Sequence, residues 1–154
     1  MTDLRIGIVG AGGMGTAHAT NIAGLGAQVA GVHDVNIEAA RTLAATVSCD
    51  RATDSLDALF RQDLDGVVIT TPPAVRLDPV RLACERGIPL MIEKPPAFSM
   101  GEGRECAQLI GGSDAFAAVG FQLRYSPLYE RLRAILARET VHLVRTVCTI
   151  DYYL

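Results

Sequence analysis

A glycine-rich turn near the N-terminus restricts the fold of this 154-residue chain more than any other feature. The segment 10–15 reads G-A-G-G-M-G and follows an apolar, strand-like run at 5–9. In a G-x-G-x-x-G turn, Gly10 permits the tight bend, Gly12 lets the backbone approach a pyrophosphate, and Gly15 lets the next helix pack closely. The start of that helix offers unpaired N–H groups to phosphate. The pattern therefore predicts a strand–turn–helix unit that binds a dinucleotide.

An acidic residue follows at the spacing that such a site requires. Asp34 ends a second apolar run, 28–33, about 20 residues beyond the turn, where a carboxylate can accept hydrogen bonds from ribose hydroxyls. In the alternative interpretation, the turn is purely structural and Asp34 caps the helix expected over 37–47. The agreement of turn, strand and spacing favours the dinucleotide site. A carboxylate repels a 2′-phosphate, and Val35 and Asn36 supply no cation, so we predict NAD in preference to NADP.

Short apolar runs alternate with helical stretches along the chain, which is typical of βαβ units and a parallel sheet. The expected strands are 5–9, 28–33, 49–52, 66–70, 88–92, 115–121 and 141–150. Capping residues mark two of the helices between them. Asp78 is the expected N-cap of one, with Pro79 in its first turn, and Ser99 and Glu102 have capping-box spacing. We predict an α/β fold with a doubly wound parallel sheet of the Rossmann type.

The composition is that of a globular domain, with 49% hydrophobic residues, 20% charged residues and a net charge of −3. It excludes a disordered chain and offers no basic surface for nucleic acid. No apolar run approaches the ~18 residues of a membrane span, and the early strand leaves no room for a secretory signal. The four cysteines and three histidines are scattered, so we expect free thiols, no metal site and a cytoplasmic protein.

Two further motifs follow buried strands. T-T-P-P at 70–73 comes after one strand, and E-K-P-P at 93–96 comes after the next. The carboxyl ends of parallel strands meet at one edge of the sheet, where doubly wound proteins bind ligands. The alternative for Glu93 and Lys94 is a surface turn with a weak ion pair. Their place beside the expected dinucleotide crevice favours a functional role.

Taken in order, the motifs G-A-G-x-M-G-x-x-H-A, T-P-P, E-K-P and G-F-x-x-R-Y-x-P resemble the glucose–fructose oxidoreductase/inositol dehydrogenase (Gfo/Idh/MocA) family. The resemblance implies an NAD(P)-dependent dehydrogenase that transfers hydride at a hydroxyl or keto carbon of a sugar, inositol or related polyol. It implies an NAD(P)-binding Rossmann domain over 1–122. Residues 123–154 would then be a connecting helix and the first strand of a truncated α/β substrate domain. We therefore expect the 154-residue chain alone to be less than fully active.

The resemblance also implies roles for individual residues. Those expected to bind the dinucleotide are Gly10, Gly12, Met14, Gly15 and Asp34, with Thr71, Pro72 and Glu93 on the nicotinamide-ribose side. Lys94 is implied as the catalytic residue beside the reacting carbon, where a cation assists removal of a hydroxyl proton. Arg124 and Tyr125 are implied near the substrate, the alternative being a surface arginine and a packed tyrosine. His18 is expected to be a hydrogen-bonded structural residue.

Two departures from the family pattern matter. Arg76 stands where the family often has a histidine, and the chain stops at Leu154, before the domain that usually carries an acid/base histidine. The expected last strand has apolar residues on both faces, and such an edge invites pairing with another chain. We therefore expect a homo-oligomer, or pairing through 141–154.

Two alternatives to a dehydrogenase stay open at this point. The chain can be a non-catalytic dinucleotide-binding subunit with a regulatory or partner role. It can also be a degenerate protein that keeps the fold without the site.

Overall fold

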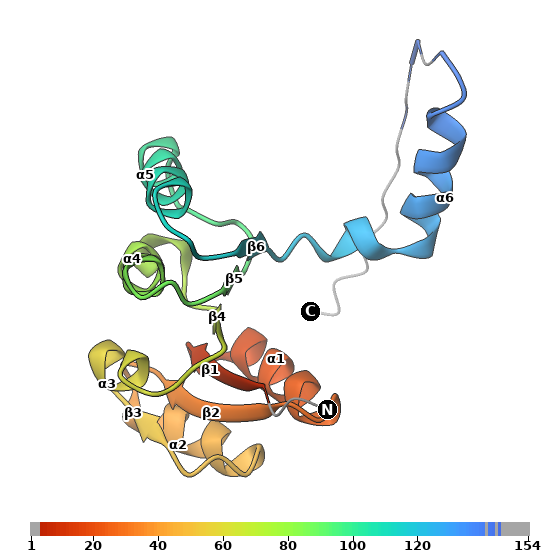
Figure 1. Ribbon diagram of the computed structural model, residues 1–154. Helices are drawn as coiled ribbons and strands as arrows, with labels where there is room; N and C mark the ends of the chain where they lie inside the picture. Colours follow the sequence, from red (N-terminus) through yellow and green to blue (C-terminus); the bar gives the residue numbers. More distant parts are fainter. Residues whose placement is uncertain (1–3, 141, 144, 146–154) are drawn as a thin grey trace, which may run out of the picture. The chain divides into compact units, whose positions relative to one another are not determined.

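The computed structural model describes residues 4–140, 142, 143 and 145, and its centre is a six-stranded parallel sheet (Figure 1). The strands are β1 (Arg5–Val9), β2 (Gln28–His33), β3 (Ala52–Thr53), β4 (Gly66–Ile69), β5 (Leu90–Ile92) and β6 (Ala117–Val119). They lie in the order β3-β2-β1-β4-β5-β6, with every neighbouring pair parallel. This is the strand order of the classic doubly wound sheet, so the predicted fold class is confirmed.

A helix connects each strand to the next, as expected of a series of βαβ units. They are α1 (Gly13–Gly24), α2 (Ile37–Thr46), α3 (Leu56–Phe60), α4 (Leu77–Glu85), α5 (Met100–Gly111) and α6 (Pro127–Leu136), with two short 3₁₀ helices, η1 (Pro73–Val75) and η2 (Gln122–Tyr125). No helix among the described residues is long and apolar enough to cross a membrane.

The chain divides into two compact units, Met1–Gly120 and Phe121–Leu154. The first contains the whole sheet and helices α1 to α5, and the second contains η2 and α6. The predicted boundary between a Rossmann domain over 1–122 and the start of a substrate domain over 123–154 stays a prediction. Most of the strand expected at 141–150 lies outside the described residues.

The sheet is buried on both faces. Successive residues of its central strands point to opposite faces, and each face packs against helices. Val9, Val67 and Ile69 belong to a core cluster that includes residues of α3, α4 and α5. Ile8 and Val68 belong to a second cluster with residues of α1 and α2. This two-sided burial explains why β1 and β4 appear in the sequence as short, continuous apolar runs.

Capping residues define the starts of two helices in different ways. The predicted capping box of α5 is confirmed, because Ser99 Oγ accepts from the Glu102 N–H at 3.3 Å and the Glu102 carboxylate accepts from the Ser99 N–H at 3.2 Å. The predicted cap of α4 is wrong. That helix begins at Leu77, with Arg76 at the N-cap and Asp78 inside the first turn. The preceding 3₁₀ turn leads the chain directly into α4, and Pro79 is tolerated there because first-turn N–H groups need no helical acceptor.

Candidate functional site

The glycine-rich turn connects β1 to α1, and packing requires two of its glycines. Gly10 has φ of +102°, and a Cβ there would lie 2.7 Å from Thr70 Oγ1. At Gly15 a Cβ would lie 1.9 Å from the Gly10 carbonyl oxygen, so a side chain would push the helix away from the strand. At Gly12, in contrast, no atom of the described residues, apart from the glycine and its chain neighbours, lies within 4 Å of the Cβ position. The protein therefore leaves the space beside Gly12 open to an approaching ligand.

The first turn of α1 presents backbone donors on that open side. The Thr16 N–H makes the first bond of the helix, to the Gly12 carbonyl at 2.9 Å. The N–H groups of Gly13, Met14 and Gly15 precede it and have no acceptor within the helix. The first turn carries no acidic side chain, so none of the helix's own residues offsets the positive end of the helix dipole. Such a helix start binds phosphate groups well.

Asp34 follows the last residue of β2, and its carboxylate is hydrogen-bonded to the glycine turn. Its Oδ2 accepts from the Ala11 N–H at 2.7 Å, and its Oδ1 accepts from the Asn36 N–H at 2.9 Å. The cap of α2 is Asn36, whose side chain accepts from the Glu38 N–H at 3.1 Å. The interpretation of Asp34 as a helix cap is therefore wrong. Each carboxylate oxygen keeps a lone pair with which it can accept a hydrogen bond from a ribose hydroxyl.

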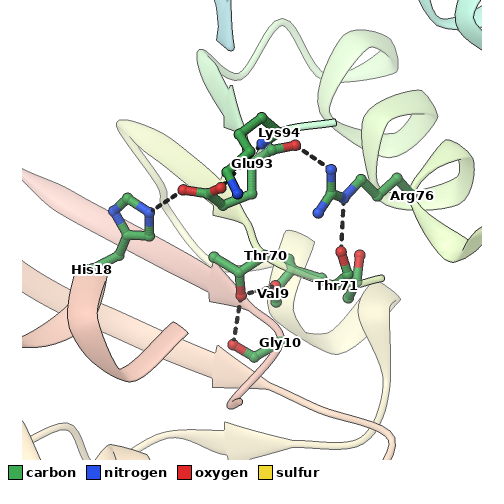
Figure 2. A network of polar contacts seen from close by, with 8 residues as sticks. All are labelled: Val9, Gly10, His18, Thr70, Thr71, Arg76, Glu93 and Lys94. Atoms are coloured by element: carbon green, nitrogen blue, oxygen red, sulfur yellow. Dashed lines mark hydrogen bonds and ion pairs between the residues drawn. The ribbon is translucent and has the colours of Figure 1, made fainter. Parts of the chain in front are cut away.

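Thr70 joins the loop after β4 to the glycine turn. Its hydroxyl lies 3.0 Å from the Val9 carbonyl and 2.9 Å from the Gly10 carbonyl, and it donates to this pair of acceptors (Figure 2). The next residue, Thr71, has a buried hydroxyl oxygen with no hydrogen-bond partner among the described residues. A buried polar atom without a partner is costly, and it indicates a place where a ligand group can bond.

Glu93 is 3% exposed and connects three parts of the site (Figure 2). Its Oε1 lies 2.9 Å from His18 Nε2 on α1, and its Oε2 accepts from the Lys94 N–H at 3.0 Å. Gly120 makes room for the carboxylate, because a Cβ there would lie 3.1 Å from Oε1. His18 is hydrogen-bonded, as predicted. The alternative of a surface Glu93–Lys94 ion pair is wrong, since the carboxylate is buried and pairs with His18.

Lys94 itself is exposed at the end of β5, directly after the buried Glu93. It is the only lysine in the chain, and all other residues of the Lys/Arg class are arginines. A lysine ammonium is a compact charge on a flexible stem with three rotatable donors, unlike the planar guanidinium of an arginine. The peptide bond between Lys94 and Pro95 is cis.

Arg76 is the residue whose role the sequence did not reveal. It is 4% exposed, and its Nε donates to the Thr71 carbonyl at 2.7 Å (Figure 2). Its Nη1 donates to the carbonyls of Glu93 and Pro95. Burial lowers the pKa of Arg76, and the nearby Glu93 carboxylate opposes that shift. A lone cation between the apolar neighbours Val75 and Leu77 is the signal that could have identified it.

The structure brings most of the predicted site residues to the carboxyl edge of the sheet. These residues are Gly10, Gly12, Met14, Gly15, Asp34, Thr71, Pro72, Glu93 and Lys94, at or just beyond the ends of β1, β2, β4 and β5. The edge combines donors for an anion, a carboxylate for hydroxyls, an orphaned hydroxyl and one lysine. Arg124 and Tyr125 are exposed residues of η2 in the second unit, and their place near a substrate stays a prediction.

Known proteins resemble this chain in sequence and in structure. Residues 4–121 match the model of the Gfo/Idh/MocA family, described as an oxidoreductase family with an NAD-binding Rossmann fold. Inositol 2-dehydrogenase of Mycolicibacterium gilvum is 36% identical over 140 residues, which are 88% of this chain and 40% of that protein. The solved UDP-N-acetylglucosamine 3-dehydrogenase of Acidithiobacillus ferrooxidans has a TM-score of 0.79 and 32% identity, over 88% of this chain and 44% of its own.

A third relative was solved with a cofactor. GenD2 from gentamicin A biosynthesis, in complex with NAD, has a TM-score of 0.80 and 25% identity, over 88% of this chain and 39% of that one. The chain thus spans about 40% of the length of the relatives that it matches. Similarity covers the sheet and its carboxyl edge, where the site residues lie.

Proposed function

Because the chain belongs to the Gfo/Idh/MocA family of oxidoreductases, which has an NAD-binding Rossmann fold, we propose that it carries the cofactor-binding half of an NAD-dependent dehydrogenase. The observation that carries this proposal is the glycine turn closed by Asp34. It combines an open surface at Gly12, helix-start N–H groups and a carboxylate that is hydrogen-bonded to the same turn through the Ala11 N–H.

The proposed substrate is a sugar, inositol or related polyol that loses or gains hydride at a hydroxyl-bearing or keto carbon. The relatives named as inositol 2-dehydrogenase and UDP-N-acetylglucosamine 3-dehydrogenase support this class. The bound nicotinamide would supply the hydride chemistry. Lys94 would hold or accept the proton of the reacting hydroxyl, and Arg124 and Tyr125 would contact the substrate.

The site residues divide the cofactor between them in this proposal. Gly10, Gly12, Met14 and Gly15 would hold the pyrophosphate, and Asp34 the hydroxyls of the adenosine ribose. Thr71, Pro72 and Glu93 would line the nicotinamide-ribose side. The orphaned Thr71 hydroxyl supports that placement, because a ribose hydroxyl would satisfy it. The carboxylate of Asp34 disfavours the 2′-phosphate of NADP, so NAD is the proposed cofactor.

Replacing Asp34 by alanine tests the cofactor site. Loss of the charged acceptor is expected to weaken NADH binding about tenfold or more, the equivalent of one hydrogen bond to a charged group. The chain contains no tryptophan, so the fluorescence of bound NADH can be titrated without energy transfer from tryptophan. Asp50→Ala, at an exposed position outside the site, is the control and is expected to bind NADH normally.

Two outcomes of this titration would contradict the proposal. An Asp34→Ala variant with unchanged NADH affinity would show that the ligand does not use this carboxylate. A wild-type chain with a folded circular dichroism spectrum and no NADH binding at millimolar concentration would favour a protein that keeps the fold without the site.

A non-catalytic dinucleotide-binding subunit is the second candidate function. The match to the family model over 4–121 favours it, because those residues form the cofactor-binding fold. We also propose that residues 1–154 alone turn substrate over poorly, since the relatives contribute more chain than this to a complete enzyme. A dinucleotide-binding subunit would depend on Asp34 and be indifferent to Lys94, whereas a dehydrogenase would depend on both.

Self-association through 141–154 is a separate part of the proposal, argued from the two-sided apolar sequence. A chain truncated after Arg138 is expected to form a smaller species than the full chain when both are compared by light scattering. Equal particle sizes would contradict pairing through this segment. We also propose a cytoplasmic setting, supported by the free thiols of Cys49, Cys84 and Cys106.

A further inference from the structure

We propose that Arg76 is a positioning residue whose buried guanidinium joins the loop after β4 to the loop after β5 and holds Thr71, Glu93 and Lys94 in one fixed arrangement. The inference rests on the proposed cofactor site, and it adds a residue that would shape the nicotinamide side without contacting the ligand itself.

The contacts of Arg76 reach both loops at once. Nε donates to the Thr71 carbonyl in the first loop, and Nη1 donates to the carbonyls of Glu93 and Pro95 in the second. A guanidinium is planar, and its N–H groups point in fixed directions. The three carbonyls must therefore keep their mutual spacing, and neither loop can move without the other.

Lys94 lies between the two carbonyls that Nη1 binds. Its backbone is held on one side at Glu93 and on the other at Pro95, while its own N–H bonds to the Glu93 carboxylate at 3.0 Å. Three hydrogen bonds thus determine where the lysine side chain starts. A residue proposed to meet a reacting carbon needs such support, because a displacement of about 1 Å can cost about 100-fold in rate.

The position of Arg76 is unfavourable for the helix that it begins. It is the N-cap of α4 and makes no side-chain capping bond, and a cation there meets the positive end of the helix dipole. Serine, threonine, aspartate or asparagine would stabilise that helix start better. Burying a cation is also costly unless its donors are satisfied. The side chain therefore serves the two loops rather than the helix.

Loosening these loops should affect only the part of the cofactor that they would contact. ADP has the adenosine and the two phosphates of NADH but neither the nicotinamide nor the ribose that carries it. It would still be held by the glycine turn and by Asp34, which Arg76 does not touch. The ratio of NADH affinity to ADP affinity therefore reports on the two loops that Arg76 joins.

The experiment titrates the wild-type chain and its Arg76→Ala and Arg76→Lys variants with NADH and with ADP. In Arg76→Ala the affinity ratio is expected to fall about tenfold, as for the loss of a hydrogen bond to a charged group, with ADP affinity within about twofold of wild type. Added guanidinium ion at millimolar concentration is expected to restore part of the ratio. Lysine keeps the charge without the planar fork, so an intermediate ratio is expected for Arg76→Lys.

Arg86→Ala is the matched control. Arg86 lies at the other end of α4, where it donates to the Phe60 carbonyl at 3.3 Å, far along the helix from the loops in question. Its removal is expected to leave the affinity ratio unchanged. If Arg76→Ala does not fold, backbone hydrogen exchange of Arg76→Lys carries the test, with faster exchange expected in 71–76 and 93–96 and no such change in Arg86→Ala.

The outcomes separate this inference from the proposed function. An unchanged ratio in Arg76→Ala, or an equal loss of both ligands, would overturn the positioning role while leaving the cofactor site in place. Unchanged exchange in Arg76→Lys would overturn it as well. A wild-type chain that binds neither NADH nor ADP would overturn the proposed function, and the role of Arg76 with it.

Discussion

Replacing Lys94 by alanine is expected to lower the rate of hydride transfer about 10²–10⁴-fold, the usual contribution of a positioned acid or base, while NADH affinity stays within about twofold. The lysine is exposed at the end of β5, directly after the buried Glu93 that anchors its backbone. Turnover is measured as NADH formation with a panel of polyols and sugars that begins with myo-inositol, in the polypeptide as isolated from its source.

The matched variant is Lys94→Arg, which keeps the positive charge. A guanidinium does not release its proton at moderate pH, so this variant is also expected to lose most of its turnover. Equal turnover in the wild type and in Lys94→Ala, with a functional Asp34, would support a dinucleotide-binding subunit instead.

Lys94 can also be observed directly, because the chain has no other lysine. Isotope-labelled reductive methylation should give one side-chain signal besides that of the N-terminal amine. NADH is expected to shift this signal in wild type and to leave it in place in Asp34→Ala at the same NADH concentration. A Lys94 signal whose position does not change at saturating NADH would place Lys94 away from the cofactor.

Replacing Gly15 by alanine is the second change for which we expect a large effect. The new Cβ would lie 1.9 Å from the Gly10 carbonyl oxygen, a backbone atom that no side-chain rotation can move. The start of α1 must then shift away from β1, which takes its N–H groups out of reach of a pyrophosphate. We expect NADH affinity to fall about 100-fold, the equivalent of about two hydrogen bonds to charged groups, and the melting temperature to fall as well.

Two other glycines separate packing from ligand contact. Gly12→Ala is expected to keep the wild-type melting temperature and to lose NADH binding, because only the ligand would occupy the space of its Cβ. Gly24→Ala lies at the far end of α1, where the new Cβ would meet no other part of the described structure within 4 Å, and it is expected to keep full affinity and to gain up to about 1 kcal/mol of stability. Normal NADH binding by Gly12→Ala would contradict the proposed path of the pyrophosphate.

The bounds of the first two strands follow directly from the sequence. β1 and β2 coincide with the apolar runs at 5–9 and 28–33, because both are buried on two faces and end at a glycine or an acidic residue. The outer strands are shorter than their apolar runs. β5 and β6 have three residues each, against five and seven expected, since hydropathy does not distinguish a ladder residue from an apolar loop residue packed beneath it.

The candidate site divides in the same way. Local spacing alone identified the glycine turn, Asp34 and the two motifs after β4 and β5, because each depends on a few consecutive residues and on the parallel sheet that brings strand ends together. Local spacing could not predict the pairing of His18 with Glu93, since 75 positions separate the two residues. Nor could it predict that Asn36, rather than Asp34, is the cap of α2.

The sequence by itself determined the doubly wound fold class, the glycine-rich turn and the sheet edge at which the candidate site lies, because apolar periodicity and glycine spacing are local properties and alternating βαβ units imply parallel strands. The tertiary structure alone decided how the site is held together. Arg76, 17 positions from Glu93, bonds to three carbonyls of two loops, and only the folded chain brings those carbonyls within reach of one guanidinium. Long-range hydrogen bonds to backbone atoms leave no pattern in the sequence, since every residue carries the same carbonyl.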